Sequence, residues 1–350
     1  MSFELIKPNS NVNFIGNRYK AFVVSGLLIL ISIVSMIYHK GLNLGVDFKG
    51  GLLLQFRLQE NPGAEALRAT FGEANFAISS LQNFGDTGNE YLVNLSDSPV
   101  AEGQSLSQAA VALLEKTYGE DKVEIRREEM VGPKVGQDLR QKALYAIYYS
   151  ILIIIIYISG RFEKKWGTSA IFVAILLGII YVVSLFGVGV GTLIIVALIV
   201  TLITCYALKF SFALGGIIAL MHDVIITAGV FSLLNKEITL SFVAAILTII
   251  GYSLNDSIIV FDRIRENTAK TRKADLPTLI NKSINETLSR TILTSGTTVM
   301  ALLSLYFLGG PVNRDFALAL LIGVSVGTLS SIFLAAPILL LWEKKRPAKI

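Results

Sequence analysis

An aspartate lies inside an apolar run that is long enough to cross a membrane. The run extends from about Leu240 to Phe261, and Asp256 stands about two-thirds of the way along it. An ionisable group at membrane depth costs several kcal/mol and is by default a functional-site hypothesis, with a basic partner to be found. Arg290, at the start of the next apolar run, is the expected partner. Such a pair could bind and release a proton, or it could be a fixed ion pair between two helices.

Small polar residues accompany Asp256 and could hold a carboxylate with ordered water. On a helix, Tyr252 and Ser253 share its face. The predicted supporting residues are Tyr252, Ser253, Asn255, Ser257, Thr294 and Thr298. Burial disfavours the charged carboxylate, whereas a nearby guanidinium favours it. An aspartate that alternates between these surroundings would carry protons, and one held permanently by Arg290 would only lock two helices. The residues leave both interpretations open.

A second pair of ionisable residues, His222 and Asp223, lies near the middle of the apolar run 211–234. Adjacent residues on a helix point about 100° apart, so we do not expect both to face one partner. We expect Asp223 to belong to the interior polar network, either as a proton relay or as a structural hydrogen-bonding group. For His222 we favour a neutral imidazole between helices, with a part in the network as the alternative.

Charged residues mark the end of the Asp256 run. Asp262 and Arg263 are expected at the water interface, solvated or paired, with a role in coupling as the alternative. Further along, the segment 323–327 reads Gly-Val-Ser-Val-Gly, a small-residue pattern that lets helices approach closely.

The composition is that of a membrane protein. Of 350 residues, 53% are hydrophobic and only 16% are charged. The net charge of +5 comes from basic residues beside the apolar runs, which indicates membrane orientation and not nucleic-acid binding. The chain has one cysteine and two histidines and lacks a P-loop, a metal-spaced His/Cys cluster and a nucleophile elbow. We therefore expect no enzyme, no metal and no cofactor, with protons as the coupling ion.

Residues 40–141 have the composition of a water-soluble domain. Strands are expected at 52–58, 76–83, 91–95 and 122–127, with helices at 62–71 and 101–118. The order β-α-β-β-α-β is that of a ferredoxin-like α+β domain.

The rest of the chain reads as membrane spans, eight in all with the first. They are expected at 21–38, 142–159, 169–186, 192–208, 211–234, 240–262, 291–308 and 316–342. Basic residues gather on the side of the N-terminus, the loop 263–290 and the tail 344–350, which predicts that this side is cytoplasmic and that the soluble domain lies outside. The predicted division is 1–39, 40–141, 142–160, an inserted hairpin 161–210, a four-span bundle 211–343 and the tail 344–350.

Four motifs in this order resemble the SecD/SecF family of protein-export membrane proteins, within the resistance-nodulation-division superfamily. They are Gly-Val-Asp-Phe-Lys-Gly-Gly at 45–51, Val-Gly-Pro-Lys-Val-Gly at 131–136, Met-His-Asp-Val at 221–224 and the segment 251–267; Ser-Arg-Thr-Ile-Leu-Thr-Ser at 289–295 extends the match. The resemblance implies that the family's intramembrane aspartate and arginine correspond to Asp256 and Arg290. Together with Asp223 of the interior polar network, they are the predicted proton-relay residues.

The same resemblance implies partners and a location. A SecD subunit, the SecYEG translocon and the unfolded exported polypeptide are the expected partners, in the lipid bilayer of the bacterial inner membrane, with the soluble domain in the periplasm. The family's usual six spans would join residue 163 almost directly to residue 210, so the charge-free hairpin at 169–208 departs from the pattern. We expect this hairpin to face lipid or a partner, outside the proton path.

The expected function is therefore proton-driven assistance to protein translocation. The first alternative is a proton-coupled small-molecule or lipid transporter of the same superfamily. The second is a scaffold that moves no protons, and an integral-membrane enzyme comes third.

Overall fold

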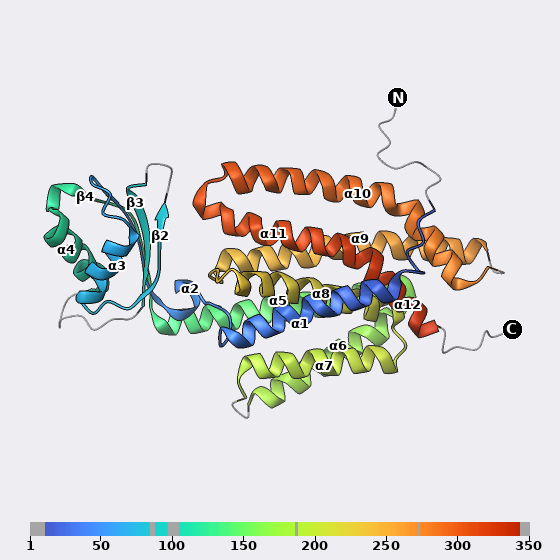
Figure 1. The fold of residues 1–350 in the computed structure, drawn as a ribbon. Coiled ribbons are helices and arrows are strands. Elements are labelled where there is room, and N and C mark those ends of the chain that lie inside the picture. Colours follow the sequence, from blue (N-terminus) through green and yellow to red (C-terminus); the bar gives the residue numbers. More distant parts are fainter. Residues whose placement is uncertain (1–10, 85–87, 97–104, 186–187, 272–273, 344–350) are drawn as a thin grey trace.

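A computed structural model describes residues 11–84, 88–96, 105–185, 188–271 and 274–343. It consists of a small sheet domain at one end of a helical bundle, whose helices run roughly parallel to one another (Figure 1). Helix α1 begins and α12 ends at the end of the bundle opposite the sheet domain, which is called the far end below (Figure 1).

The sheet domain has the ferredoxin-like order predicted from the sequence. Its elements are β1 (Gly51–Leu58), α3 (Ala64–Glu73), β2 (Ile78–Phe84), β3 (Glu90–Leu95), α4 (Leu106–Tyr118), a 3-10 turn (Glu120–Lys122) and β4 (Val123–Val131). The sheet order is β2-β3-β1-β4, and every neighbouring pair is antiparallel. Helices α3 and α4 lie on the side of the sheet away from the bundle (Figure 1).

The core of the sheet domain follows from the alternation of β1. Leu52, Leu54 and Phe56 all lie on one face and are fully buried. They belong to one apolar cluster with Leu67 and Phe71 of α3. Phe56 lies 5.7 Å from the Tyr91 ring of β3, measured between centroids. The opposite face of the sheet is turned toward the bundle (Figure 1).

The bundle is built from ten helical elements. They are α1 (Arg18–Tyr38), the short α2 (Val46–Lys49), α5 (Pro133–Glu163), α6 (Trp166–Ser184), α7 (Val190–Ala207), α8 (Ser211–Leu233), α9 (Leu240–Lys270), α10 (Leu276–Leu308), α11 (Gly310–Ser330) and α12 (Ala336–Glu343). In the described part of the chain, seven helical stretches are long and apolar enough to cross a membrane, and the apolar α7 is slightly shorter.

Three helices are longer than the sequence analysis predicted. Helix α5 begins at Pro133, inside the predicted soluble domain, with proline in the first turn where its missing N–H costs nothing. The prediction of a loop over 263–290 is wrong, because α9 continues to Lys270 and α10 starts at Leu276. Asp275 caps α10 by accepting from Thr278 N at 3.2 Å. At the far end, Arg263 of α9 pairs with Glu286 of α10, so part of this polarity is satisfied between two helices.

The last predicted span, 316–342, is interrupted. Helix α11 runs into a π-helical turn over Ser331–Ala335 before α12 begins. Single π turns inside helices are frequent at functional sites. The backbone here is closely packed, since a Cβ on Gly215 of α8 would lie 2.9 Å from Ala335 O.

The segment before α1 is fixed to α10. Asn285 accepts from Val12 N and donates to Val12 O, both at 2.9 Å. One turn earlier, Asn281 Oδ1 accepts from Phe14 N at 2.9 Å. The Phe14 ring is buried and lies 5.5 Å from that of Phe333 in the π turn, centroid to centroid. The N-terminal segment thus closes the far end of the bundle.

The hairpin formed by α6 and α7 packs against α5 and α8. It lies on the side of the bundle opposite α10 (Figure 1). Ser159 of α5 and Ser169 of α6 share a buried hydrogen bond of 2.5 Å between their hydroxyls. The predicted turn of the hairpin includes residues 186 and 187, which lie outside the described residues.

Candidate functional site

Asp223 ties three helices together in the middle of the bundle. Its side chain is fully buried. Ser253 of α9 donates to Oδ2 at 2.6 Å, and Ser330 of α11 donates to the same oxygen at 2.9 Å. His222 Nδ1 lies 2.9 Å from Oδ1. One carboxylate of α8 therefore accepts from its own helix and from both neighbours.

Two glycines of α11 permit this close approach. A Cβ on Gly327 would lie 3.0 Å from Ser253 Cβ and 3.3 Å from Asp223 Oδ2. At Gly323 the side chain of Ile249 already occupies the place that a Cβ would need. The Gly-Val-Ser-Val-Gly segment acts as the packing motif that its sequence indicates. At Gly327 it also makes room for the buried carboxylate.

Asp256 lies in the same layer, between α9, α10 and α11. Its side chain is buried, and Ser295 of α10 donates to Oδ2 at 3.3 Å. Thr328 of α11 lies 2.7 Å from Ser295, oxygen to oxygen. Ser253 and Asp256 are one turn apart on α9, and Thr328 and Ser330 are two residues apart on α11.

The two carboxylates and their hydroxyl neighbours form two adjacent groups, in which Ser253 and Ser330 bond Asp223 and Ser295 bonds Asp256. We call the two groups together the polar seam: Asp223, Ser253, Asp256, Ser295, Thr328 and Ser330. Every side chain in it is buried except the half-buried Thr328. Buried acids with hydroxyl neighbours can hold and pass a proton along hydrogen bonds, which is the chemistry that the arrangement supports.

Arg290 is not where the sequence analysis placed it. The side chain is exposed on α10, and among the described residues no ion pair within 4.0 Å joins it to Asp256. The contact that α10 makes with Asp256 comes from Ser295, five residues further along the helix.

Of the other predicted supporting residues, some join helices and others do not. Tyr252 OH donates to Thr298 Oγ1 at 3.2 Å and joins α9 to α10 beside the seam. Thr294 donates to Arg290 O within its own helix. Ser257 is buried, whereas Asn255 is exposed on the outside of the bundle. Tyr252 and Thr298 thus support the α9–α10 contact, and Asn255 lies outside the network.

His222 contacts Asp223 itself, a pairing that the sequence analysis did not predict. The imidazole Nδ1 lies 2.9 Å from the carboxylate Oδ1. Its Nε2 atom is buried and without a hydrogen-bond partner in the described chain. A second polar group at Nε2 would be needed for a relay through this ring.

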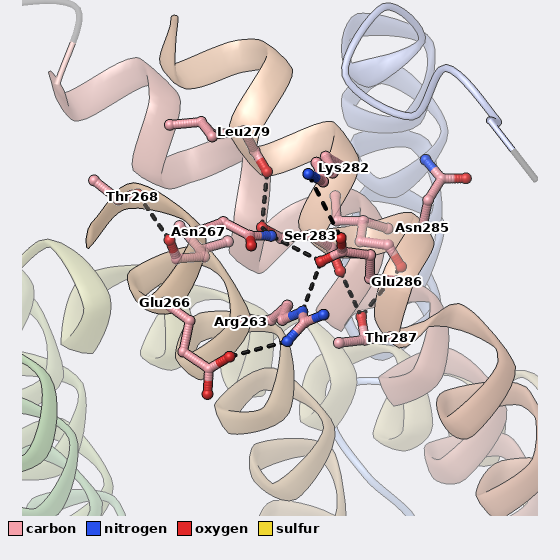
Figure 2. A network of polar contacts seen from close by, with 12 residues as sticks. Arg263, Glu266, Asn267, Thr268, Leu279, Lys282, Ser283, Asn285, Glu286 and Thr287 are labelled. Carbon is pink, nitrogen blue, oxygen red and sulfur yellow. Dashed lines mark hydrogen bonds and ion pairs between the residues drawn. The ribbon is translucent and has the colours of Figure 1, made fainter. Parts of the chain in front are cut away.

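Asp262 and Arg263 are both paired at the far end. Asp262 forms an ion pair with Arg161 of α5. Arg263 Nε lies 2.6 Å from Glu286 Oε2 of α10, and Nη1 lies 2.9 Å from Glu266 (Figure 2). The two residues fix the end of α9 to two different neighbours.

A polar network that the sequence analysis missed surrounds Glu286. Asn267 of α9 donates to Glu286 at 2.8 Å and to Ser283 Oγ at 2.9 Å (Figure 2). The seam donors Ser295, Thr328 and Ser330 were missed as well. Serine and threonine inside apolar runs at helical spacing are the available signal, but such hydroxyls also bond their own helix, as Thr294 does.

The fold and the seam define a class: a polytopic helical membrane protein with a ferredoxin-like domain and buried intramembrane carboxylates. Sequence models of the SecD/SecF family match the chain twice over. The model described as "Protein export membrane protein SecD/SecF, C-terminal" matches residues 110–205 and 188–345, and the "SecD/SecF GG Motif" model matches 36–61. The chain belongs to the SecD/SecF family of protein export membrane proteins. The two matched segments overlap over 188–205, so the family model is not aligned straight through the α6–α7 hairpin.

Relatives and solved structures agree with this assignment. The chain is 39% identical to the protein translocase subunit SecF of Calditerrivibrio nitroreducens over 345 residues, covering 98% of both chains. It is 38% identical to that of Escherichia coli O157:H7, covering 94% of this chain and 87% of the relative. The crystal structure of SecDF, a translocon-associated membrane protein from Thermus thermophilus, matches with a TM-score of 0.68 and 31% identity. That match covers 97% of this chain but only 40% of the SecDF chain.

Metal chemistry finds no support in the geometry. Across the residues that the structure describes, no three His, Cys, Asp or Glu side chains gather as a metal site.

Proposed function

We propose that the chain is the SecF-type half of a proton-driven complex that assists protein translocation across the bacterial inner membrane. Its partners would be a SecD subunit, the SecYEG translocon and the unfolded exported polypeptide. The relatives named as translocase subunits support the translocation role. The observation that carries proton coupling is the polar seam, in which two carboxylates are buried inside the bundle and each accepts from a hydroxyl of a neighbouring helix.

Protons supply enough work for such a role. Moving one charge through the membrane potential yields about 2.3 kcal/mol per 100 mV. A few protons could therefore switch a bundle between states that differ by a few kcal/mol. In this proposal Asp256 binds and releases the proton, and Arg290 favours the charged form of Asp256 from a distance. Asp223 orders the hydroxyls that surround the proton route.

A SecD subunit is supported by an uncovered polar face. Between residues 241 and 255 of α9, the exposed residues follow a three-and-four spacing and are all small or polar: Ser241, Ala244, Thr248, Gly251 and Asn255. On α10 the exposed residues include Arg290, Thr297, Ala301 and Ser304. Lipid is a poor neighbour for Asn255 and Arg290, whereas small-residue stripes suit close packing of another helix. This chain matches only 40% of the solved SecDF chain. The remainder of that chain is long enough to contain the second half that would cover this face.

Orientation follows from charge. Arg161, Lys165, Arg263 and Arg265 lie at the far end of their helices, whereas Lys236 and Arg314 lie at the end that bears the sheet domain. The excess of basic residues supports a cytoplasmic far end and a periplasmic sheet domain.

Replacing Asp256 by Asn tests the carrier role. We expect Asp256→Asn, co-expressed with SecD, to abolish the part of export into membrane vesicles that an imposed proton gradient stimulates. Asp315→Asn is the matched control, because Asp315 pairs with Lys236 at 2.9 Å outside the seam. Stimulation that survives in Asp256→Asn would favour the scaffold without proton movement. Efflux of a small substrate that depends on Asp256, with export unaffected, would favour the transporter.

A further inference from the structure

The turn between α8 and α9 holds the segment that leads into the sheet domain. Ile238 N donates to Asn43 O at 2.7 Å, and Gly45 N donates to Ile238 O at 2.9 Å. These two bonds make a parallel bridge between Leu44 and Ile238. The turn thus pairs with the chain just before the sheet domain, as a short strand would.

Two side-chain contacts strengthen this junction. Asp47 Oδ2 accepts from Leu240 N, the first residue of α9, at 2.8 Å. Asn94 of β3 is buried and donates to Glu237 Oε2 of the turn at 2.6 Å. A hydrogen bond to a carboxylate is among the stronger kinds. The sheet itself, and not only its leading segment, is therefore bound to the turn.

The sheet domain has a second point of attachment on α5. That helix follows β4 directly, and its Gly136 lies so close to α2 that a Cβ there would be 3.0 Å from both Phe48 O and Gly50 N. Beside the turn, a cavity of about 320 Å³ lies between the sheet and the bundle; it is lined by Leu53, Leu92 and Phe242, among others. A body held at two points tilts when one point moves relative to the other.

The held turn connects the two helices that bear the carboxylates. Asp223 lies on α8 and Asp256 on α9, and residues 234–239 are all that separates these helices. A change in the seam that shifts α8 and α9 relative to α5 must therefore carry the turn with it.

We propose that the α8–α9 turn is a permanent latch, through which movement of the two carboxylate helices tilts the sheet domain about its attachment on α5. The latch consists of Asn43, Gly45, Asp47 and Asn94 on one side and Glu237, Ile238 and Leu240 on the other. The proposal rests on the proton-driven function above and adds the route by which the state of the seam reaches the outer domain.

Breaking the latch is the first test. Glu237→Gln replaces the charged acceptor of Asn94 while keeping the shape of the side chain. We expect hydrogen exchange of the amides at 43–47 in the full-length complex with SecD to rise about tenfold, and gradient-stimulated export to be lost while basal export stays unchanged. Glu60→Gln is the matched control, because Glu60 pairs with Lys122 at 2.6 Å within the sheet domain, away from the turn.

Locking the latch is the second test. Leu44→Cys with Ile238→Cys places two thiols at bridged positions, and the native Cys205 is buried elsewhere. Because the latch is permanent in this proposal, the oxidised protein should export as well as the reduced one. A block on oxidation that a reductant reverses would overturn the proposal, since the domain would then have to leave the turn.

The outcomes separate the latch from the proposed function. Unchanged exchange at 43–47 in Glu237→Gln, or increased exchange with full gradient stimulation, overturns the latch. If Asp256→Asn, measured in parallel, loses stimulation while Glu237→Gln keeps it, only the latch fails. If Asp256→Asn also keeps it, the proton-driven function fails first.

Discussion

The two carboxylates of the polar seam differ in how completely they are held. Asp223 has three polar neighbours within 2.9 Å, contributed by α8, α9 and α11. Among the described residues, Asp256 has a single donor, Ser295, at 3.3 Å. A carboxylate offers about four acceptor sites, so Asp256 retains unused capacity and Asp223 has little. Asp223 therefore holds helices of the bundle together, whereas Asp256 is free to change its partners.

Replacing each carboxylate in turn tests whether Asp223 contributes more to stability than Asp256. Asp223→Ala leaves the hydroxyls of Ser253 and Ser330 buried without their acceptor, and we expect a loss of about 3 kcal/mol in the free energy of unfolding. Asp256→Ala should cost about 1 kcal/mol or less, because only the long Ser295 contact is lost. Denaturant unfolding of both variants in the same detergent measures the difference, and equal losses would contradict it.

Adding a methyl group at a buried and at an exposed glycine gives a second comparison of stability. Gly327→Ala places a methyl group 3.3 Å from Asp223 Oδ2 and 3.0 Å from Ser253 Cβ, and we expect a loss of about 2 kcal/mol. A Cβ on Gly251, five residues before Asp256 and on the exposed face of α9, meets nothing within 4 Å. Gly251→Ala should leave the isolated chain as stable or slightly more so.

Gly251→Ala has a second readout in the complex. The uncovered face of α9 is the one that we assign to SecD, so a methyl group there should weaken co-purification of the two subunits while Gly327→Ala changes folding instead. Undiminished co-purification would count against this assignment of the face.

Removing single hydroxyls gives the smallest effects. Ser253→Ala deletes the 2.6 Å hydrogen bond to Asp223, and we expect a loss of about 1.5 kcal/mol. Ser295→Ala deletes the 3.3 Å contact to Asp256, and about 0.5 kcal/mol is expected. Thermal unfolding of the two variants side by side checks the order, and a larger loss for Ser295→Ala would reverse our ranking of the two acids.

The sequence was sufficient to predict the architecture wherever the signal is local. Alternation in β1 and the apolar runs depend only on neighbouring residues, and the sheet order and membrane helices were predicted correctly. Residues 263–290 misled because charge near a span end looks like a solvated loop. In the structure these charges are satisfied across the helix pair, as between Arg263 and Glu286. A pairing between residues 23 apart cannot be recognised from the local pattern.

The candidate site was predicted in its acids and in one donor, Ser253, but not in its other donors. Asp223 and Asp256 stand out because a carboxylate in an apolar run is costly. Ser295, Thr328 and Ser330 do not, since hydroxyls are common in membrane helices and bond their own backbone. Arg290 was expected at Asp256 by charge alone, yet which side chain fills the contact position depends on the rotation of α10. That rotation is set by packing over the whole helix.

The π turn at Ser331–Ala335 has a geometric consequence for everything after it. Each extra residue in a helical turn rotates the following chain by about 100° relative to an uninterrupted α-helix. Thr328 and Ser330 precede this wide turn, and the buried Leu339 and Leu340 follow it. On an uninterrupted α-helix, Thr328 and Leu339 would lie within about 20° of the same direction, because eleven residues make about three full turns. The added residue therefore turns the buried leucines away from the direction of the hydroxyls. The five residues of the π turn thus set the relative rotation of the polar first half of that span and its apolar second half.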